Sequence, residues 1–395
     1  MADPRPIRVF IVAAEPSGDA LAGDLIDALR TLNPTVEIAG VGGVEMERRG
    51  AHSPFDISDL SVFGVFDGLK IVNLVHQRAE ETAQAAKAFG ADAIVLIDSW
   101  GFMLRTAWKL EDQLPDVPRI KYVAPQVFAA RRGRAKIAAE HFTHLLAIHP
   151  FDAPFFEPFG MPVRFVGNPV LDRDLSGDGP ALREQLGISE HAPVLLVLFG
   201  SRRSELSRLF APFSDAIRRL KAARPDLEVL TALSPAIEAE ARERIESAPA
   251  LEGVHIVSAD ARADAFAAAD LAIACSGTVT VELARAGVPT IAAYKLGWLY
   301  YAVVRLFLMK AKFISLTNIA AGEELIPELV QLRCNGDALA ETAGALLDDP
   351  DRRADLSRRL QAVSTQMAGE AASPSQAAAQ AVLEIVDERK KAGAG

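Results

Sequence analysis

Short runs of Val, Ile and Leu alternate with Ala- and Arg-rich helical stretches along most of this 395-residue chain. Continuous apolar runs are typical of strands covered on both faces, as in parallel sheets flanked by helices. This alternation predicts a doubly wound α/β fold. We predict strands in the first half at Ile7–Ala13, Val36–Gly40, Ala93–Ile97, Ile120–Val123, Leu145–Ile148 and Val163–Val166, and in the second half at Val194–Phe199, Glu228–Ala232, His255–Ser258, Leu271–Ala274 and Thr290–Ala293.

The alternation restarts once, after a Gly- and Asp-rich stretch at Asp172–Gly179. A chain of this length is also long for a single core. We therefore predict two Rossmann-like doubly wound domains facing across a cleft. The first spans residues 1–171, the second spans residues 180–345, and C-terminal helices over 346–395 are free to cross back to the first domain.

Charge and cysteine content exclude several functions. The net charge of -10 argues against broad nucleic-acid binding, which requires a basic face. Cys275 and Cys334 are the only cysteines, so neither a disulfide framework nor a paired-cysteine zinc site is indicated. The first apolar run is short and is interrupted by Glu15, unlike a signal peptide. These features indicate a cytoplasmic protein.

Loops after the strands of the first half are the places to look for chemistry, because doubly wound sheets bind ligands at the carboxyl ends of their strands. The segment "AAEPSGDALAGDL" carries Glu15, Ser17, Gly18 and Asp19, and either binds an anion or a sugar hydroxyl or caps a helix. The segment "DAIVLIDSWGF" places Asp98 at the end of an apolar strand. Partial burial there suits a general base, and the alternatives are a helix cap or a salt bridge.

Two further stretches of the first half are weaker signals. The glycines of "GVGGVEM" follow a strand but lack the spacing of a dinucleotide-binding fingerprint. Arg131 belongs to a small basic cluster in "YVAPQVFAARRGRAKIA". The cluster either meets a phosphate at a cleft loop or forms a solvated face.

The second half twice places small residues at a strand-to-helix junction. In "FGSRRSE", Ser201 and Arg202 combine backbone N–H groups with a guanidinium, a good diphosphate site. In "CSGTVTVELARAGVPTI", Ser276, Gly277 and Thr278 begin a helix that carries Glu282, a carboxylate suited to ribose hydroxyls. No lysine completes a P-loop, so magnesium-dependent nucleotide hydrolysis is not indicated. Two such loops predict a nucleotide-diphosphate ligand, the layout of a B-type glycosyltransferase.

The order and spacing of several short motifs resemble the lipid-A-disaccharide synthase family, from about Ile7 to about Gln331. The motifs are "AEPSGD", "GVGGVEM", "YVAPQV", "FVGNPV", "GSRRSE", "SGTVTVELA", "YK" and "NIAAGEELIPELVQ". The resemblance implies an inverting glycosyltransferase that joins a 2,3-diacylglucosamine unit from its UDP derivative onto 2,3-diacylglucosamine 1-phosphate and releases UDP. It also implies a peripheral enzyme of the inner membrane with no tightly bound metal or other cofactor, and suggests a homodimer.

The resemblance also implies roles for individual residues. Residues facing UDP would be Arg202, Ser276, Gly277, Thr278, Glu282 and Asn318, with Ser201 beside them. Residues on the acceptor side would be Glu15, Ser17, Gly18, Asp19, Asp98 and Arg131. Asp98 is the best candidate for deprotonating the attacking hydroxyl, and Glu15 and Asp19 are the next candidates.

The acceptor half departs from the family pattern. The usual D-x-P-D-F-N reads "DSWGFML" here, Y-V-S-P-S-V-W-A-W-R reads "YVAPQVFAARR", and a P-N pair reads "TN". Three alternatives to the family's own reaction therefore stay open. The first is a paralogue with a different lipid acceptor, and the second is a UDP-sugar epimerase or hydrolase on the same fold. The third is a non-catalytic protein that binds UDP-sugar or lipid.

The stretch "YKLGWLYYAVVRLFLMKAKF" is unusually apolar. Its uncharged run between Lys295 and Arg305 is shorter than the roughly 20 residues of a spanning helix. Helical spacing places Tyr300, Val303, Val304, Phe307 and Leu308 on one face. This pattern is typical of an interfacial helix or of one packed into a core. We expect Trp298, Val303, Phe307 and Leu308 to contact the membrane or an acyl chain.

Overall fold

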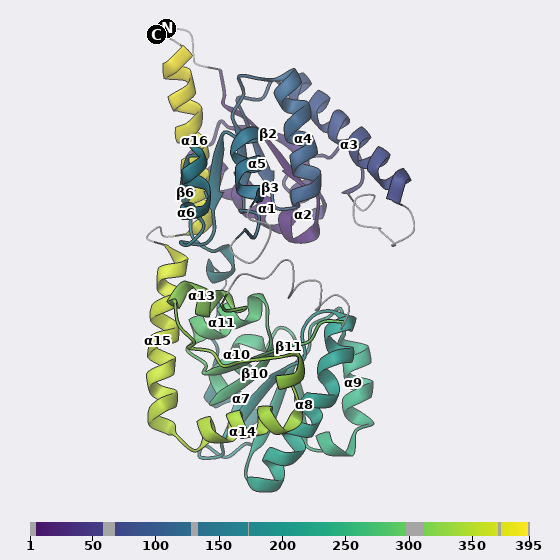
Figure 1. Ribbon diagram of the computed structural model, residues 1–395, viewed down its shortest axis with the longest axis vertical. Helices are drawn as coiled ribbons and strands as arrows, with labels where there is room; N and C mark the ends of the chain where they lie inside the picture. The colour runs from purple at the N-terminus through teal and green to yellow at the C-terminus, as the bar shows by residue number, and fades with distance from the viewer. Residues whose placement is uncertain are drawn as a thin grey trace. The chain divides into compact units, whose positions relative to one another are not determined.

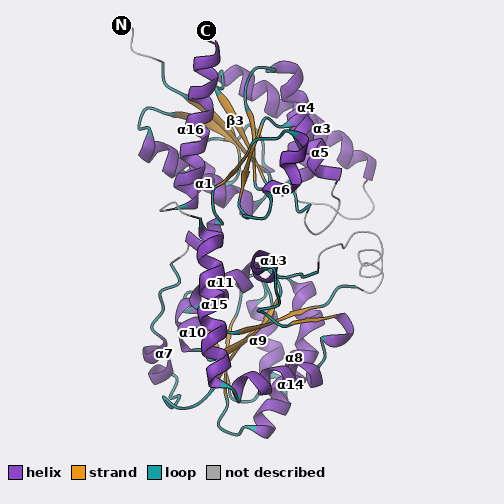
Figure 2. Ribbon diagram, turned by 60° about the vertical axis from the view of Figure 1, so that its left-hand side comes forward, coloured by secondary structure: helices purple, strands orange, loops and turns teal. Residues whose placement is uncertain are grey.

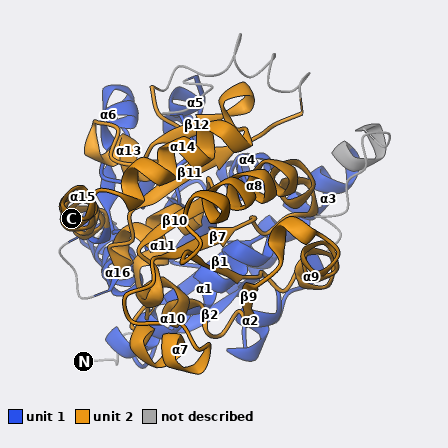
Figure 3. Cartoon of the chain, turned by 90° about the horizontal axis from the view of Figure 1, so that it is seen from below, with its two compact units in different colours: residues 1–169, 368–395 blue, residues 170–367 orange. Residues whose placement is uncertain are grey.

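The computed structural model describes residues 5–57, 68–127, 133–172, 174–297, 312–369 and 373–393 (Figure 1). Parallel sheets flanked by helices make up both halves of the chain, as the alternation of apolar runs predicts (Figure 2). The chain divides into two compact units, residues 1–169 with 368–395 and residues 170–367 (Figure 3).

The sheet of the first unit has six parallel strands in the order β2-β1-β3-β4-β5-β6. They are β1 (Arg8–Ala13), β2 (Glu37–Val41), β3 (Ala93–Ile97), β4 (Arg119–Tyr122), β5 (His144–Ala147) and β6 (Val163–Phe165). Each strand predicted in this half is confirmed, with ends that differ by one or two residues. The middle strands are buried along almost their whole length, which explains their continuous apolar sequence.

Helices cover both faces of this sheet, and alternate strand residues pack against opposite layers. Val9 and Ile11 pack with α1 (Pro16–Leu32) and α16 (Pro374–Gly393). Phe10 and Val12 pack with α3 (Gly68–Phe89), α4 (Trp100–Gln113) and α5 (Gly133–His141). The short helices α2 (Val44–Arg48), α6 (Ala153–Phe156) and η2 (Glu157–Phe159) occupy the connections.

The last helix of the chain belongs to the first unit. Helix α16 lies against α1 and buries Val382 and Ile385 in the core (Figure 1). Arg164 at the β6 edge forms ion pairs with Glu384 and, at 2.8 Å, with Glu388. The preceding helix α15 (Pro350–Ala368) lies almost wholly in the second unit.

The second unit has the strand order β12-β11-β10-β7-β8-β9, again all parallel. The strands are β7 (Val194–Leu198), β8 (Glu228–Ala232), β9 (Val254–Val257), β10 (Leu271–Cys275), β11 (Thr290–Tyr294) and β12 (Glu328–Val330). Counted from β7, this is the 3-2-1-4-5-6 order of a dinucleotide-binding Rossmann domain. Both units are therefore doubly wound, as predicted.

Two helical layers enclose the second sheet. One contains α8 (Arg203–Ala223), α9 (Glu238–Glu246), η4 (Pro249–Leu251) and α14 (Gly336–Leu347). The other contains α7 (Gly179–Gln185), α10 (Arg262–Ala268) and α11 (Thr278–Ala286). Helix α13 (Leu316–Ala321) precedes β12, and η6 (Gln331–Arg333) follows it. Along the chain, η3 (Pro169–Asp172) begins at the last residue of the first unit and continues into the second.

One strand was not predicted, and no membrane-spanning helix is found among the described residues. Strand β12 was not predicted, because three residues after Pro327 carry too short a pattern to distinguish a strand from a loop. Among the residues that the structure describes, no helix combines the length and apolarity needed to cross a bilayer. Trp298, Val303, Phe307 and Leu308 lie in the range 298–311, outside the described residues, as does Arg131.

Candidate active site

The loops after β1 and β3 leave the first sheet at its switch point. The two strands are neighbours, with Ala13 opposite Ile97, but the chain continues to β2 on one side and to β4 on the other. Such a divergence opens a crevice at the carboxyl ends of the strands. Glu15 and Asp98 follow the ends of these two strands, so both acids lie at the switch point. Glu15 is exposed and Asp98 is half-buried.

Asp98 has an unusual backbone. Its φ angle is 49° and that of Ser99 is 30°, and both lie in the left-handed region that non-glycine residues rarely adopt. Val123, just past the end of the neighbouring strand β4, has a φ of 70°. The Asp98 backbone N–H donates to the Tyr122 carbonyl at 3.0 Å. Strained residues therefore gather where β3 and β4 end, which is typical of functional sites.

Lys121 lies directly beneath this turn and was missed by the sequence analysis. Its side chain is 1% exposed, and its Nζ donates to the carbonyls of Asp98 at 2.6 Å, Tyr122 at 3.2 Å and Leu96 at 3.3 Å. Burial lowers the pKa of Lys121 to about 7, against the opposing effect of the Asp98 and Glu15 carboxylates. A lysine inside a strand predicted to be buried was the signal that could have identified it.

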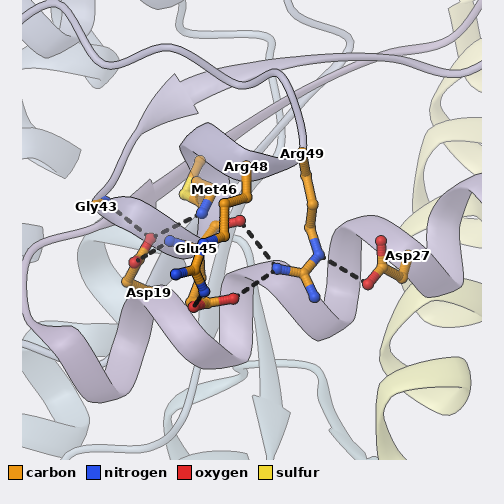
Figure 4. A network of polar contacts seen from close by, with 7 residues as sticks. All are labelled: Asp19, Asp27, Gly43, Glu45, Met46, Arg48 and Arg49. Atoms are coloured by element: carbon orange, nitrogen blue, oxygen red, sulfur yellow. Dashed lines mark hydrogen bonds and ion pairs between the residues drawn. The ribbon is translucent and has the colours of Figure 1, made fainter.

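Asp19 is buried, and its carboxylate is hydrogen-bonded to the protein main chain. The residue is 4% exposed, and its carboxylate accepts backbone hydrogen bonds from Gly43 at 2.8 Å, Glu45 at 2.8 Å and Met46 at 3.2 Å (Figure 4). These bonds satisfy the free N–H groups at the start of α2. The Asp19 carboxylate therefore acts as a cap of α2. Ser17 is exposed in the first turn of α1, and Gly18 is buried beside Ala13.

The glycines of "GVGGVEM" allow close packing, Gly40 against the neighbouring strand β1 and Gly43 against Asp19. A Cβ on Gly40 would lie 1.9 Å from the Ile11 carbonyl oxygen, and one on Gly43 would lie 2.8 Å from Asp19 Oδ2. Arg49 extends the network by bonding Asp27 at 2.7 Å and Glu45 at 2.9 Å (Figure 4). The two N-terminal motifs therefore form one structural unit that fixes α1 against α2.

The loop that contains Ser201 and Arg202 follows β7. Gly200 adopts a φ of 100°, and a Cβ there would lie 2.5 Å from Glu205 Oε2, so only glycine fits. Glu205 Oε2 accepts from the backbone N–H groups of Ser201 at 2.9 Å and Arg202 at 3.2 Å. The Arg202 guanidinium also reaches Glu205, at 3.2 Å, although its side chain is 79% exposed. A carboxylate thus occupies the N–H groups that the sequence assigned to a diphosphate.

The loop that contains Ser276 and Gly277 follows β10, the neighbour of β7. Leu198 lies opposite Ala274, and the chain turns in opposite directions after the two strands, so this is the switch point of the second unit. Gly277 and Thr278 are exposed at the start of α11, and Ser276 is half-buried. Glu282 is 1% exposed one turn further on and forms an ion pair with Arg262 of α10. The structure brings Ser201, Arg202, Ser276, Gly277 and Thr278 onto adjacent loops.

Asn318, on α13, is the centre of a buried hydrogen-bond network. Its Nδ2 donates to the Ile326 carbonyl at 2.7 Å and to Glu328 at 2.9 Å, and its Oδ1 accepts from the Leu325 and Ile326 N–H groups. The amide hydrogens and the carbonyl oxygen are thus fully engaged inside the protein. Asn318 therefore organises the turn before β12 and leaves no hydrogen-bonding position for UDP.

Two further buried titratable residues, which the sequence did not single out, follow β5. Asp152, at the start of α6, is completely buried, and burial raises its pKa to about 7. Burial also lowers the pKa of His149 to about 4, and the imidazole stacks on Phe151 with ring centroids 5.0 Å apart. A backbone hydrogen bond at His149 acts against this rise in the pKa of Asp152 but is the smaller of the two effects. Both residues stand in the loop after a predicted strand, the position that revealed Asp98.

The part of the chain that the structure describes contains no candidate metal site. No group of three or more His, Cys, Asp or Glu side chains there converges closely enough to hold an ion. The chemistry available at the two switch points is that of carboxylates, guanidinium groups, hydroxyls and main-chain N–H groups.

Comparison with known proteins gives matches along nearly the whole chain. A family model described as Lipid-A-disaccharide synthetase matches residues 9–384. A lipid-A-disaccharide synthase of Rhodospirillum centenum is 38% identical over 387 residues, covering 98% of this chain and 96% of that protein. Another, of Ruegeria pomeroyi, is 40% identical over 355 residues, covering 88% of each chain.

Solved structures share the fold at much lower identity. A glycosyltransferase from Rickettsia africae superposes with a TM-score of 0.59 at 13% identity, covering 98% of this chain and 99% of that one. A UDP-GlcNAc 2-epimerase from Neisseria meningitidis, bound to UDP-GlcNAc, also has a TM-score of 0.59, at 11% identity, covering 97% and 100%. At such identities the likeness is one of architecture.

Proposed function

The chain belongs to the lipid-A-disaccharide synthase family, and from this premise we propose how its residues divide the work of making the lipid A disaccharide. It is a glycosyltransferase of the B-type fold that uses a UDP-sugar donor. The donor in this proposal is UDP-2,3-diacylglucosamine, and the acceptor is 2,3-diacylglucosamine 1-phosphate. The observation that carries the division is that the motif loops of each unit meet at that unit's own switch point.

UDP is assigned to the second unit. The exposed guanidinium of Arg202 binds the diphosphate, as a planar donor pair suited to phosphate oxygens. Ser276, Gly277 and Thr278 supply hydroxyl and main-chain N–H donors from the neighbouring loop, at the start of a nine-residue helix. Glu282 is buried and paired with Arg262, so in this proposal it links α11 to α10 and does not face the ribose hydroxyls.

The acceptor is assigned to the first unit, with Asp98 as the general base. The attacking hydroxyl oxygen bonds to the anomeric carbon of the donor sugar while the bond from that carbon to the UDP oxygen breaks. Asp98 takes the proton of the hydroxyl, and UDP leaves with the bonding electron pair. Half-burial at the end of an apolar strand suits a carboxylate for this step. Glu15, exposed on the adjacent loop, is the next candidate.

Membrane attachment is assigned to the apolar stretch around Phe307. Both substrates carry acyl chains, so the enzyme must reach them at the inner-membrane surface. Trp298, Val303, Phe307 and Leu308 are the residues proposed to contact acyl chains or the bilayer. Self-association as a homodimer is part of the same proposal, taken from the family.

The test is product analysis with the proposed substrates. Purified protein is incubated with UDP-2,3-diacylglucosamine and 2,3-diacylglucosamine 1-phosphate, and the lipids are measured by mass spectrometry. A disaccharide 1-phosphate formed with one equivalent of UDP is the expected result. Free diacylglucosamine without disaccharide, or an epimerised UDP-sugar, would overturn the proposal and favour a hydrolase or an epimerase.

A further inference from the structure

The side chain of Lys121 makes hydrogen bonds in addition to the main-chain bonds that pair its strand with β3. The sheet already pairs β4 with β3, with Leu96 opposite Lys121 and Ile97 opposite Tyr122. The lysine nevertheless turns its Nζ toward three main-chain carbonyls, of Leu96, Tyr122 and Asp98. The shortest of these bonds, 2.6 Å, goes to Asp98, past the end of β3.

Three carbonyl oxygens match the three hydrogens of an ammonium group. A neutral amine has two hydrogens and a lone pair, and the lone pair would face one of the oxygens. A buried cation is costly unless its hydrogens are bonded, and here all of them have an acceptor. The Asp98 and Glu15 carboxylates are the charged groups that act on the ammonium, one from the loop after β3 and one from the loop after β1.

The bond to Asp98 falls where the backbone is strained. Left-handed φ angles at Asp98 and Ser99 persist only where surrounding contacts enforce them. Two contacts enforce this turn from the β4 side, namely the Asp98 N–H to the Tyr122 carbonyl and the Lys121 Nζ to the Asp98 carbonyl. Main-chain N and O of the same residue are thus both tied to one strand.

We propose that Lys121 is a positioning residue for Asp98. The Lys121 ammonium holds the left-handed turn that presents the Asp98 carboxylate at the carboxyl end of β3. The inference rests on the proposed role of Asp98 as the base. Lys121 itself is buried and does not touch the substrate. A misplacement of the base by about 1 Å lowers the rate on the order of 100-fold, so the effect belongs in kcat.

Arg119 offers a matched control. It lies two residues earlier on the same strand, is also buried, and also donates to main-chain carbonyls, those of His141 at 2.9 Å and Pro115 at 3.2 Å. These bonds are at the opposite end of β4 from the Asp98 turn. Loss of a buried cation as such therefore affects Arg119→Met and Lys121→Met alike, whereas loss of positioning affects Lys121→Met alone.

The experiment measures kcat, KM and UDP affinity for Lys121→Met, Arg119→Met, Asp98→Asn and the double variant Asp98→Asn with Lys121→Met. Lys121→Met should lower kcat on the order of 10- to 100-fold with UDP affinity unchanged. The double variant should be no slower than Asp98→Asn alone, because both changes disable one group. An equal loss in Arg119→Met, an additive double variant, or a Lys121→Met kcat within threefold of the wild type would each overturn the inference.

A pH profile keeps the test decisive if Lys121→Met does not fold. With a pKa of about 7, Lys121 loses its proton as the pH rises above that value, so wild-type kcat should fall there. Lys121→Arg stays charged and should lack this alkaline limb, and a limb that persists contradicts the inference. The two proposals fail separately. An inactive Asp98→Asn with an unaffected Lys121→Met refutes only the positioning role, whereas an active Asp98→Asn refutes the base.

Discussion

The carboxylate of Glu205 binds Arg202 twice, through the backbone N–H at 3.2 Å and through the guanidinium Nη1 at 3.2 Å. It also accepts from the Ser201 N–H at 2.9 Å. Glu205 thus fills the positions on this loop that an anion would otherwise occupy. A bound diphosphate must compete with it for the same donors.

Neutralising Glu205 should therefore strengthen UDP binding. Glu205→Gln keeps an oxygen acceptor for the loop but removes the negative charge, which frees the Arg202 guanidinium. We expect the Kd for UDP to fall by about fivefold, or roughly 1 kcal/mol, in calorimetry at low salt. The matched control is Glu240→Gln, which removes a half-buried carboxylate from α9 that also pairs with arginines. An unchanged or weaker affinity in Glu205→Gln alone would show that the carboxylate does not compete with UDP.

Removing the guanidinium should have the opposite effect. Arg202→Ala loses a charged hydrogen bond to phosphate, which typically contributes about 1.5–3 kcal/mol. Calorimetry with excess chelator should show this weakening and should also show metal-independent UDP binding by the unchanged protein. Arg203→Ala, the adjacent exposed arginine, serves as the control. Loss of wild-type binding on chelation would refute a donor site built from protein groups alone.

Asp152 and His149 should make opposite contributions to the pH dependence of stability. The native state keeps the Asp152 proton up to a pH of about 7, whereas the unfolded chain releases it near 3.8, so this residue lowers stability as the pH rises between these values. The native state loses the His149 proton at about 4 and the unfolded chain at 6.5, so His149 raises stability over that window. From about pH 4 to 6.5 the two effects cancel.

Asp152→Asn should uncover the His149 contribution. Between pH 4.5 and 6.5 the unfolding free energy of the variant should rise relative to the wild type by about 1.4 kcal/mol per pH unit, the value for one proton. His149→Gln should show the reverse trend. Urea unfolding at three pH values measures both, and parallel pH dependences in the wild type and both variants would contradict the assignment.

Attachment to lipid should depend on the stretch around Phe307. Replacing Val303, Phe307 and Leu308 by Ser removes apolar contacts that contribute on the order of 5 kcal/mol. The protein should then move from the liposome pellet to the supernatant with its UDP affinity intact. An insoluble or unfolded triple variant would instead place these side chains in a core.

The sequence located strands and strand ends well because both are local properties. Buried parallel strands are continuous apolar runs, so the central strands could be predicted. The edge strands β6 and β12 have three residues each and are only partly buried, and of these only β6 was predicted. Residue roles depended on partners distant in the chain. Asp19 is followed by helix-forming residues, but the N–H groups that it caps begin at Gly43, and the amide of Asn318 is enclosed by a turn that ends at Glu328. Lys121 acquired its role only when β4 was placed beside β3.

Turnover by Asp98→Asn tests the proposed mechanism most directly. Asparagine keeps the size and most hydrogen bonding of the side chain but cannot accept the hydroxyl proton, and a positioned base contributes about 10²–10⁴ in rate. We predict a fall in disaccharide formation of at least about 100-fold with unchanged UDP affinity, since Arg202 and its loop lie in the other unit. Turnover within a few-fold of the wild type would contradict the mechanism and make Glu15 the next residue to replace.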